Sequence, residues 1–219
     1  SDIAMPIDTS TKIFSIEAVS SNEIWIATHK PLVYRYLNQS FTTYRFDSID
    51  SKLSTGIIFK DKSGDLYVHF LKNTTGEFDY VYMFKFKNES WELVSIDPLS
   101  QNSMMFSFSG FSDNKILYTG KSGLYYFTGI KWEIYVNFGN NISYALLSCG
   151  RDAQSIIFEA RENDQTYLYY YDGKQFYRNS KIIFPYPGLQ SMEYKFGRYY
   201  ITSGEDWMGY SYLYTAIFK

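Results

Sequence analysis

The chain has 219 residues, of which 21% are aromatic and 20% charged, and its formal net charge is -2. This balance excludes the basic excess of a nucleic-acid-binding protein and the charge blocks of a disordered tail. The single cysteine, Cys149, excludes an internal disulfide framework, and no apolar run approaches the ~20 residues needed to span a bilayer. We therefore expect a β-rich globular chain without a nucleic-acid partner or a membrane span.

One short hairpin pattern occurs four times along the chain. In each copy an aromatic residue precedes a tight turn, and a second aromatic residue follows five positions after the first. The copies run from Tyr36 to Phe41, Phe86 to Trp91, Phe127 to Trp132 and Tyr171 to Phe176. The same turn offset is occupied by Asn38, Asn88, Gly129 and Gly173. Asparagine and glycine adopt positive φ at least cost, so all four residues are predicted to have it.

Two further strands precede each hairpin in chain order. The first strands are expected at residues 13–18, 56–59, 104–108, 145–149 and 192–196, and the second at 24–29, 66–71, 116–121, 156–161 and 199–204. The second strand recurs about every 40 to 50 positions, a period typical of propeller blades. With the two hairpin strands, each unit then has four strands.

The repeat predicts an all-β fold, a single five-bladed β-propeller of four-stranded antiparallel blades. The blades are expected at residues 11–46, 54–96, 103–138, 143–184 and 191–219 together with 1–8. The last unit reaches Lys219 after only three strands. Residues 2–8 are therefore predicted to supply its outer strand, antiparallel to residues 212–218, and to close the ring, because closure removes exposed sheet edges.

The segments Ser20–Thr28 and Lys60–Val68 resemble the two-component-regulator propeller repeats of bacterial extracytoplasmic sensors. This resemblance implies a propeller and a periplasmic, cell-surface or secreted setting, but it carries over no binding residue. The blade count is similar instead to small lectin-like propellers and to the catalytic domains of several glycosidase families. Fold likeness alone does not decide among these functions.

A search for chemistry yields no metal, cofactor or catalytic residue to predict. His29, His69 and Cys149 are too few for a histidine- or thiol-rich metal site, and no phosphate-cradling loop or nucleophile elbow occurs. His69 and Glu159 occupy equivalent positions in the middle of their strands. We expect both to be buried between blades with local partners.

The carboxylates of the chain keep an enzyme as the alternative function. A glycosidase with this fold would place two carboxylates about 5–10 Å apart at the mouth of its funnel. The carboxylates expected in loops on the mouth side of the propeller are Asp50, Asp97, Glu162, Asp164, Glu205 and Asp206. However, Asp8, Asp50 and Asp97 recur at similar places in their units. This recurrence favours a turn-forming role, in which the side chain accepts hydrogen bonds from nearby backbone.

The ligand site is predicted at the mouth, where the loops from second to third strands emerge. His29, Lys121 and Arg161 stand at the same strand exit in three different units and would donate hydrogen bonds to an anionic or hydroxyl-rich ligand. In the last unit, Trp207 would offer a ring face, and Glu205 or Asp206 would accept hydrogen bonds.

Together these features predict a non-catalytic recognition module for extracytoplasmic sensing or adhesion. Its ligand would be a carbohydrate, another small polar molecule or a protein, and the chain would act as a monomer or as part of a larger chain. The alternative is a five-bladed glycosidase-like hydrolase that uses carboxylates at the funnel mouth.

Overall fold

The computed structural model of the chain describes residues 6, 8–61, 63–73, 78–98, 108–110, 116–120, 123–128, 132–139, 144–152, 154–162, 165–183, 189–195, 198–203 and 213–216. These residues form β-strands, turns and connecting segments, and no helix occurs among them. The predicted all-β class is thereby confirmed.

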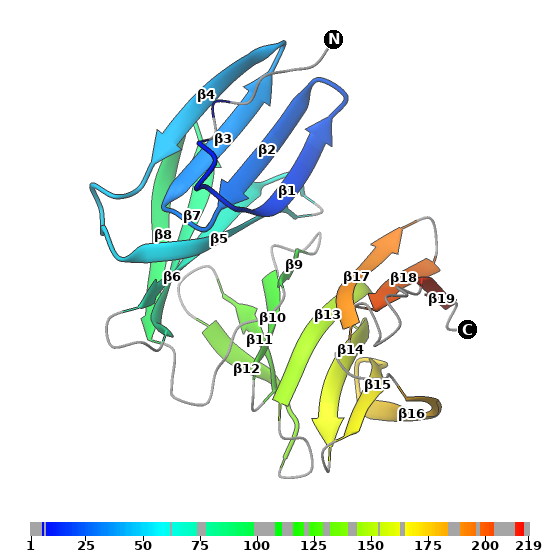
Figure 1. The fold of residues 1–219 in the computed structure, drawn as a ribbon. Helices are drawn as coiled ribbons and strands as arrows, with labels where there is room; N and C mark the ends of the chain where they lie inside the picture. The colour runs from blue at the N-terminus through cyan, green and yellow to red at the C-terminus, as the bar shows by residue number, and fades with distance from the viewer. Residues whose placement is uncertain are drawn as a thin grey trace. The chain divides into compact units, whose positions relative to one another are not determined.

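The described strands form five antiparallel sheets in two compact units, and within each sheet neighbouring strands follow chain order (Figure 1). The first unit holds β1 (Ile13–Ser20), β2 (Glu23–Thr28), β3 (Leu32–Leu37) and β4 (Ser40–Arg45), then β5 (Leu53–Lys60), β6 (Leu66–Asn73), β7 (Phe78–Lys87) and β8 (Ser90–Pro98). The second unit holds β9 (Phe108–Gly110), β10 (Ile116–Gly120), β11 (Gly123–Phe127) and β12 (Trp132–Asn137), then β13 (Tyr144–Asp152), β14 (Ser155–Glu162), β15 (Gln165–Tyr171) and β16 (Phe176–Ile183), and finally β17 (Leu189–Lys195), β18 (Arg198–Ser203) and β19 (Leu213–Ala216).

The last sheet has three described strands where the other four sheets have four. Among the described strands, β19 pairs with β18 alone. The pairing predicted between residues 2–8 and 212–218 falls mostly outside the described residues, which include only 6, 8 and 213–216 of these segments. Closure of the ring therefore stays a prediction.

The tight turns follow the backbone conformation predicted from their residue types. The φ angles are 48° at Asn38 and 50° at Asn88, and the next residues, Gln39 and Glu89, have 68° and 59°. Two successive positive φ angles are those of a type I′ turn, whose twist matches that of the paired strands. Gly173 has a φ of 91°. The prediction is confirmed at these three sites, and Gly129 lies outside the described residues.

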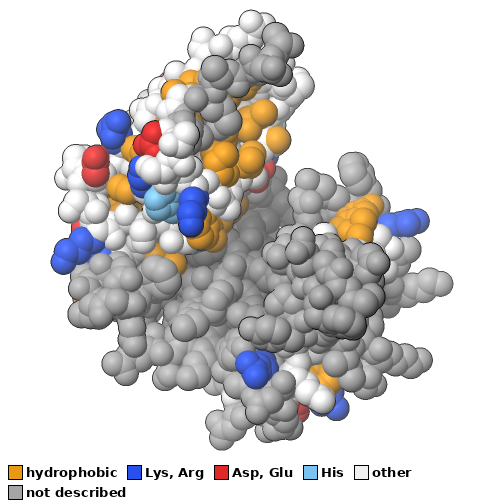
Figure 2. All heavy atoms as spheres, viewed as in Figure 1, with side chains coloured by type: hydrophobic (Ala, Val, Ile, Leu, Met, Phe, Trp, Pro, Cys, Tyr) orange, Lys and Arg blue, Asp and Glu red, His pale blue; other side chains and the backbone are white. Residues whose placement is uncertain are grey.

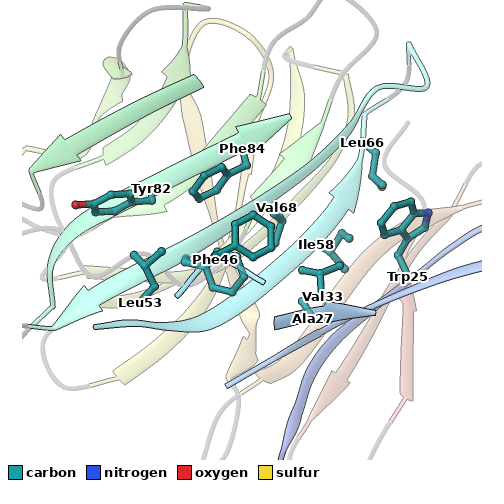
Figure 3. Packing of buried hydrophobic residues seen from close by; sticks show 11 residues of the cluster. Trp25, Ala27, Val33, Phe46, Leu53, Ile58, Leu66, Val68, Tyr82 and Phe84 are labelled. Carbon is teal, nitrogen blue, oxygen red and sulfur yellow. The ribbon is translucent and has the colours of Figure 1, made fainter. Parts of the chain in front are cut away.

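In the first unit, the core lies between the β1–β4 and β5–β8 sheets. Figure 3 shows Trp25, Val33 and Phe46 among side chains of both sheets. The Phe46 ring centre lies 4.8 Å from those of Phe70 and Phe84. Large aromatic rings at such distances bury much apolar surface and prefer these tilted or edge-on contacts. The aromatic richness of the sequence is here used for packing.

The two sheets of the first unit meet at their innermost strands, β1 and β5. The Ile58 backbone N–H donates a hydrogen bond to Ser15 Oγ at 2.7 Å. Gly56 lies so close to the neighbouring core that a Cβ there would meet the Phe70 ring at 2.6 Å and the Ala27 Cβ at 3.2 Å. A glycine is thus required by space rather than by its φ angle.

The opposite face of the β1–β4 sheet carries further apolar side chains. Figure 2 shows hydrophobic side chains gathered over this part of the first unit. Paired residues share a face of a sheet, and Ile16, Ile26 and Tyr34 follow one another across β1, β2 and β3. Ile26 and Tyr34 are buried, but Ile16 is 59% exposed and Phe14 51% exposed. The inner edge of this apolar face is therefore open to solvent.

In the second unit, a smaller core joins β11, β14, β15 and Phe138, which follows β12. Phe138 stacks on Phe158 with ring centres 5.0 Å apart, and Phe158 stacks on Tyr169 at 5.3 Å. The Tyr199 hydroxyl of β18 donates to the Ser155 carbonyl at 2.9 Å, which ties the last sheet to the preceding one. This satisfied polar contact fixes the two sheets against each other at a defined position.

Candidate functional site

Each sheet has two ends that differ in their connections. At the loop end, the second strand finishes and the third begins, as β2 and β3 do around residues 28–32. At the turn end, the hairpin turns join the first strand to the second and the third to the fourth. The mouth predicted from the sequence corresponds to the loop end, where connections are longer and more individual.

At the loop end of the β5–β8 sheet, a lysine is enclosed by one carboxylate and two tyrosines. Lys72 Nζ lies 2.6 Å from Asp50 Oδ2 and 5.8 and 6.0 Å from the ring centres of Tyr80 and Tyr82. Asp50 also accepts a hydrogen bond from the Lys52 backbone N–H at 2.9 Å. The hydrogen bond from Lys72 holds the pKa of Asp50 below its ordinary value, so this carboxylate is ionised and compensated.

A second compensated pair lies at the loop end of the β1–β4 sheet. Lys30 Nζ is 3.1 Å from Asp8 Oδ2 and 2.9 Å from Ser10 Oγ, and the Ser10 backbone N–H donates to Asp8 Oδ1 at 2.8 Å. Hydrogen bonds from Ser10 and Lys30 lower the pKa of Asp8. Asp8 and Asp50 both accept a backbone N–H from two residues further on, which confirms the predicted turn-forming role for these two.

Asp97 differs from the other carboxylates in its electrostatics. Burial raises the pKa of Asp97, because desolvation disfavours the charged form. Asp97 lies in β8 opposite Val81, at the same sheet end as Lys72. A carboxylate with a raised pKa is a candidate proton donor.

His29 follows β2 directly and is bound to the start of β1. The Lys12 backbone N–H donates to His29 Nδ1 at 2.9 Å, and the His29 backbone N–H donates to the Lys12 carbonyl at 3.0 Å. Because Nδ1 accepts, the proton of the neutral ring belongs on Nε2, which can donate to a ligand. His29 therefore lies at the predicted end of its sheet, with a structural contact on one of its two nitrogens.

At the loop end of the β13–β16 sheet, another carboxylate lies between tyrosine and arginine. Glu162 Oε2 accepts hydrogen bonds from the Tyr169 hydroxyl and from Arg178 Nη1, both at 2.8 Å. The Arg178 guanidinium carbon lies 4.7 Å from the Tyr167 ring centre. The hydrogen bond from Tyr169, with that from Arg178, lowers the pKa of Glu162. This group repeats the chemistry found around Lys72: a cation, a carboxylate and tyrosine rings.

Arg161 precedes Glu162 in β14 and pairs with Thr166 and Tyr144 across the sheet. Its side chain is half-buried at the predicted loop end. The other residues of the predicted site, Lys121, Glu205, Asp206 and Trp207, lie outside the described residues, as does Asp164. Convergence of the six residues on one ligand stays a prediction. His69 and Glu159 are both fully buried, as predicted.

The turn ends carry a cross-strand polar contact at the same register in three sheets. Its members are Glu23 and Arg35 at 2.8 Å, Asp65 and Lys85 at 2.6 Å, and Ser155 and Tyr170 at 3.4 Å. In each pair the first residue lies at or just before the start of the second strand, and its partner lies three positions before a positive-φ turn residue. The position of this cross-strand contact is thus the same in the three sheets, while the contact itself is an ion pair in two of them and a hydroxyl contact in the third.

A pocket of about 300 Å³ lies at the turn end of the β1–β4 sheet. It is lined by Ser21, Asn22, Tyr36, Asn38 and Gln39. The sequence analysis placed the ligand site at the mouth loops, so this pocket at the turn end was missed. It arises from two turns side by side, and the aligned asparagines Asn22 and Asn38 in neighbouring hairpins were the available signal.

Neither a metal site nor a spanning helix is found in the described part of the chain. No group of three or more histidine, cysteine, aspartate or glutamate residues there could hold a metal ion. No helix among those residues is long and apolar enough to cross a bilayer.

No family model and no curated protein sequence matches the chain, but solved structures of low identity do. YCF48 from Cyanidioschyzon merolae is 12% identical, with a TM-score of 0.63 over 92% of this chain and 69% of that one. YCF48 bound to D1 peptide is 11% identical, with a TM-score of 0.62 over 92% and 65%. The β-propeller domain of Cps50 (Swd1) from Myceliophteria thermophila is 10% identical, with a TM-score of 0.60 over 96% and 72%. These likenesses show that the chain has a β-propeller fold.

Proposed function

We propose that the chain is a non-catalytic recognition module that binds an extended peptide segment of a protein partner. The observation that carries this proposal is the group at the loop end of β5–β8, where Lys72 is enclosed by Asp50, Tyr80 and Tyr82. Tyr80 is 39% exposed, so its ring offers an apolar surface beside hydrogen-bonding groups. Such mixed surfaces suit a peptide, which has both apolar side chains and a polar backbone.

Charge compensation favours a peptide over a strongly anionic ligand. Asp8, Asp50 and Glu162 each have a lysine or arginine within hydrogen-bonding distance. Lys72 and Lys30 therefore carry little net attraction for an anion. YCF48 with its D1 peptide is a precedent for peptide binding by a protein of similar fold. Because fold likeness alone does not determine function, this precedent supports the proposal and nothing more.

We include two sequence-based expectations in this proposal. His29, Lys121, Arg161, Glu205, Asp206 and Trp207 would contribute to the ligand-binding face, and the protein would act outside the cytoplasm. A carbohydrate remains a second ligand class for that face. Trp207→Ala should weaken binding of the ligand that these residues contact.

We also propose that the five sheets are the blades of one closed ring. Two features support this: the three described strands of β17–β19, and the open apolar edge at Phe14 and Ile16, which a further sheet would cover. In a Cys149→Ser background, Ile16→Cys should then resist alkylation in the native state. Ile134→Cys, on the outer strand β12 and 51% exposed, serves as the reactive control. Equal and rapid alkylation of both thiols would contradict the proposed closed ring.

Peptide binding is tested by selecting binders from a displayed random peptide library and measuring their affinities by calorimetry. Tyr80→Ala should weaken a selected peptide by about tenfold or more, the loss expected for one good aromatic contact. Lys87→Ala is the matched control, since Lys87 lies at the turn end of the same strand, with Glu92 4.0 Å away. Recovery of no binder, or equal effects of the two variants, would contradict the proposed surface.

The hydrolase alternative is tested with a panel of aryl glycosides on the same protein. Turnover that Asp97→Asn abolishes would overturn the non-catalytic assignment, because Asp97 is the described loop-end carboxylate with a raised pKa. Glu92→Gln, at an exposed position near the turn end, is the matched control.

A further inference from the structure

We propose that the pocket at the turn end of β1–β4 binds a neutral saccharide, independently of the peptide surface at the loop end. The pocket has a volume of about 300 Å³ and lies between the β1–β2 turn and the β3–β4 turn. Both turns leave the same end of the sheet (Figure 1). This volume is at the lower limit of small-molecule pockets, about 300–1,000 Å³, and suits a monosaccharide or the end of a glycan.

The two turns that form the pocket are held together. The Asn38 backbone N–H donates to the Asn22 carbonyl at 3.3 Å, and the Asn22 N–H donates to Ser20 Oγ at 3.2 Å. Asn38 and Gln39 are fixed in successive positive φ conformations. A ligand would meet a turn backbone that is already in place, which reduces the ordering cost of binding.

The lining has no acidic or basic side chain. It combines serine, asparagine, glutamine and tyrosine side chains. The nearest carboxylate in sequence, Glu23, accepts hydrogen bonds from Arg35 Nε at 2.8 Å and from Trp25 Nε1 at 2.9 Å. Its charge is therefore compensated within the sheet. A neutral lining offers nothing to offset the desolvation of a charged ligand, which favours an uncharged one.

The turn end of the second sheet provides a contrast within the same unit. There the corresponding turns include Asp61, Asp65 and Glu89. Asp61 Oδ1 accepts hydrogen bonds from Ser63 Oγ at 2.6 Å and from the Asp65 N–H at 2.9 Å, so this acid is used to shape its own turn. The neutral pocket is thus a property of the first sheet and not a requirement of the repeat.

The residue types of the lining match the hydroxyl groups and the C–H face of a sugar ring. Each side-chain amide can both donate and accept a hydrogen bond, as a sugar hydroxyl does. Tyr36 adds an aromatic ring, whose centre lies 5.0 Å from that of Phe41, and aromatic faces pack well against the C–H face of a sugar. Side-chain amides next to the Tyr36 ring, which packs on Phe41, therefore favour a neutral saccharide as the ligand.

The test is a titration of the native protein, followed by NMR, with methyl α-mannoside, methyl β-galactoside and N-acetylglucosamine as separate probes. At least one of them should cause saturable shifts of the Ser21, Asn22, Asn38 and Gln39 amides. Gln39→Gly should weaken that binding by about tenfold, since it removes a hydrogen-bonding amide from the pocket. Glycine accepts the φ of 68° at this position, so the turn should persist.

Glu89→Gly is the matched control, because Glu89 follows Asn88 as Gln39 follows Asn38 and also has positive φ. It should leave saccharide affinity unchanged. The proposal is overturned if none of the three sugars gives saturable shifts at these amides, or if both glycine variants weaken binding equally. Equal affinity for glucuronate and for the neutral sugar would overturn the assigned ligand class.

Discussion

Arg35 Nε donates a hydrogen bond to Glu23 Oε1 over 2.8 Å, and the same carboxylate oxygen accepts the indole N–H of Trp25 at 2.9 Å. The guanidinium carbon lies 5.1 Å from the Trp25 ring centre, and Arg35 also pairs with Glu89 of the next sheet. One arginine thereby joins two strands, an aromatic core residue and a neighbouring sheet.

The first prediction concerns this pair, whose side chains are only 12% and 18% exposed. Arg35→Met should lower the free energy of unfolding by about 1–3 kcal/mol, because it leaves Glu23 in a mostly buried place without its cation. Urea denaturation measures the change. Arg45→Met is the control: Arg45 and Asp47 are 4.0 Å apart and largely exposed, so its effect should stay within about 0.5 kcal/mol.

The second prediction is a pH dependence of stability that comes from His69. Burial lowers the pKa of His69 from 6.5 to about 3, so between these values the unfolded chain binds a proton that the folded chain does not. Stability should therefore fall as the pH drops below 6.5, by about 2 kcal/mol at pH 5. The carboxylates with lowered pKa values act at the acid end of this window and below it.

Urea denaturation at pH 7.5 and 5 tests this dependence. In His69→Asn the difference between the two pH values should shrink by most of this amount, whatever the cost of the substitution itself. An unchanged difference would show that His69 does not carry it.

The third prediction concerns space at Gly56. Gly56→Ala should cost about 1–3 kcal/mol, because its new Cβ would lie 2.6 Å from the Phe70 ring and overpack the core. Adding Phe70→Leu should cost less in the Gly56→Ala background than in the native protein. Additive losses in this double-mutant cycle would mean that the two sites do not share the contact.

The fourth prediction concerns the β7–β8 turn, where Asn88 has a φ of 50°. Asn88→Val should lower stability by about 1–2 kcal/mol, because a β-branched side chain is strained at positive φ. Asn88→Gly keeps the conformation accessible and should change stability by only a few tenths of a kcal/mol. Thermal unfolding of the two variants compares them directly, and equal losses would refute the strain argument.

The turns were predictable because their requirement is local. A positive φ restricts the residue type at one position, and Asn38, Asn88 and Gly173 reveal it without any knowledge of partners. The start of β5 was less accessible. Its pairing with β6 shifts register between Ser54 and Ile57, and Thr55 has a φ of 55°. Threonine is not a residue type that predicts positive φ, so the sequence did not indicate this conformation.

The groups at the loop ends required information that a pattern does not contain. Asp50, Lys72 and Tyr80 belong to separate segments, and only the register of β6 with β7 pairs Lys72 with Tyr80. In the structure each charge is compensated by a partner. These partners cannot be assigned when each residue is considered by itself. Of the predicted donors, His29 and Arg161 follow or end a second strand in the structure, and the bond from the Lys12 N–H to His29 was not foreseen. Their role in binding a ligand stays a prediction.

The aromatic core of the first unit also gives the protein an optical reporter. Trp25 and Trp91 lie 5.5 Å apart, edge to face, and Trp25 is fully shielded from water. Indoles this close exchange excitation energy and couple their electronic transitions. The near-ultraviolet dichroism and the emission of this pair should therefore register separation of the first two sheets, without any attached dye.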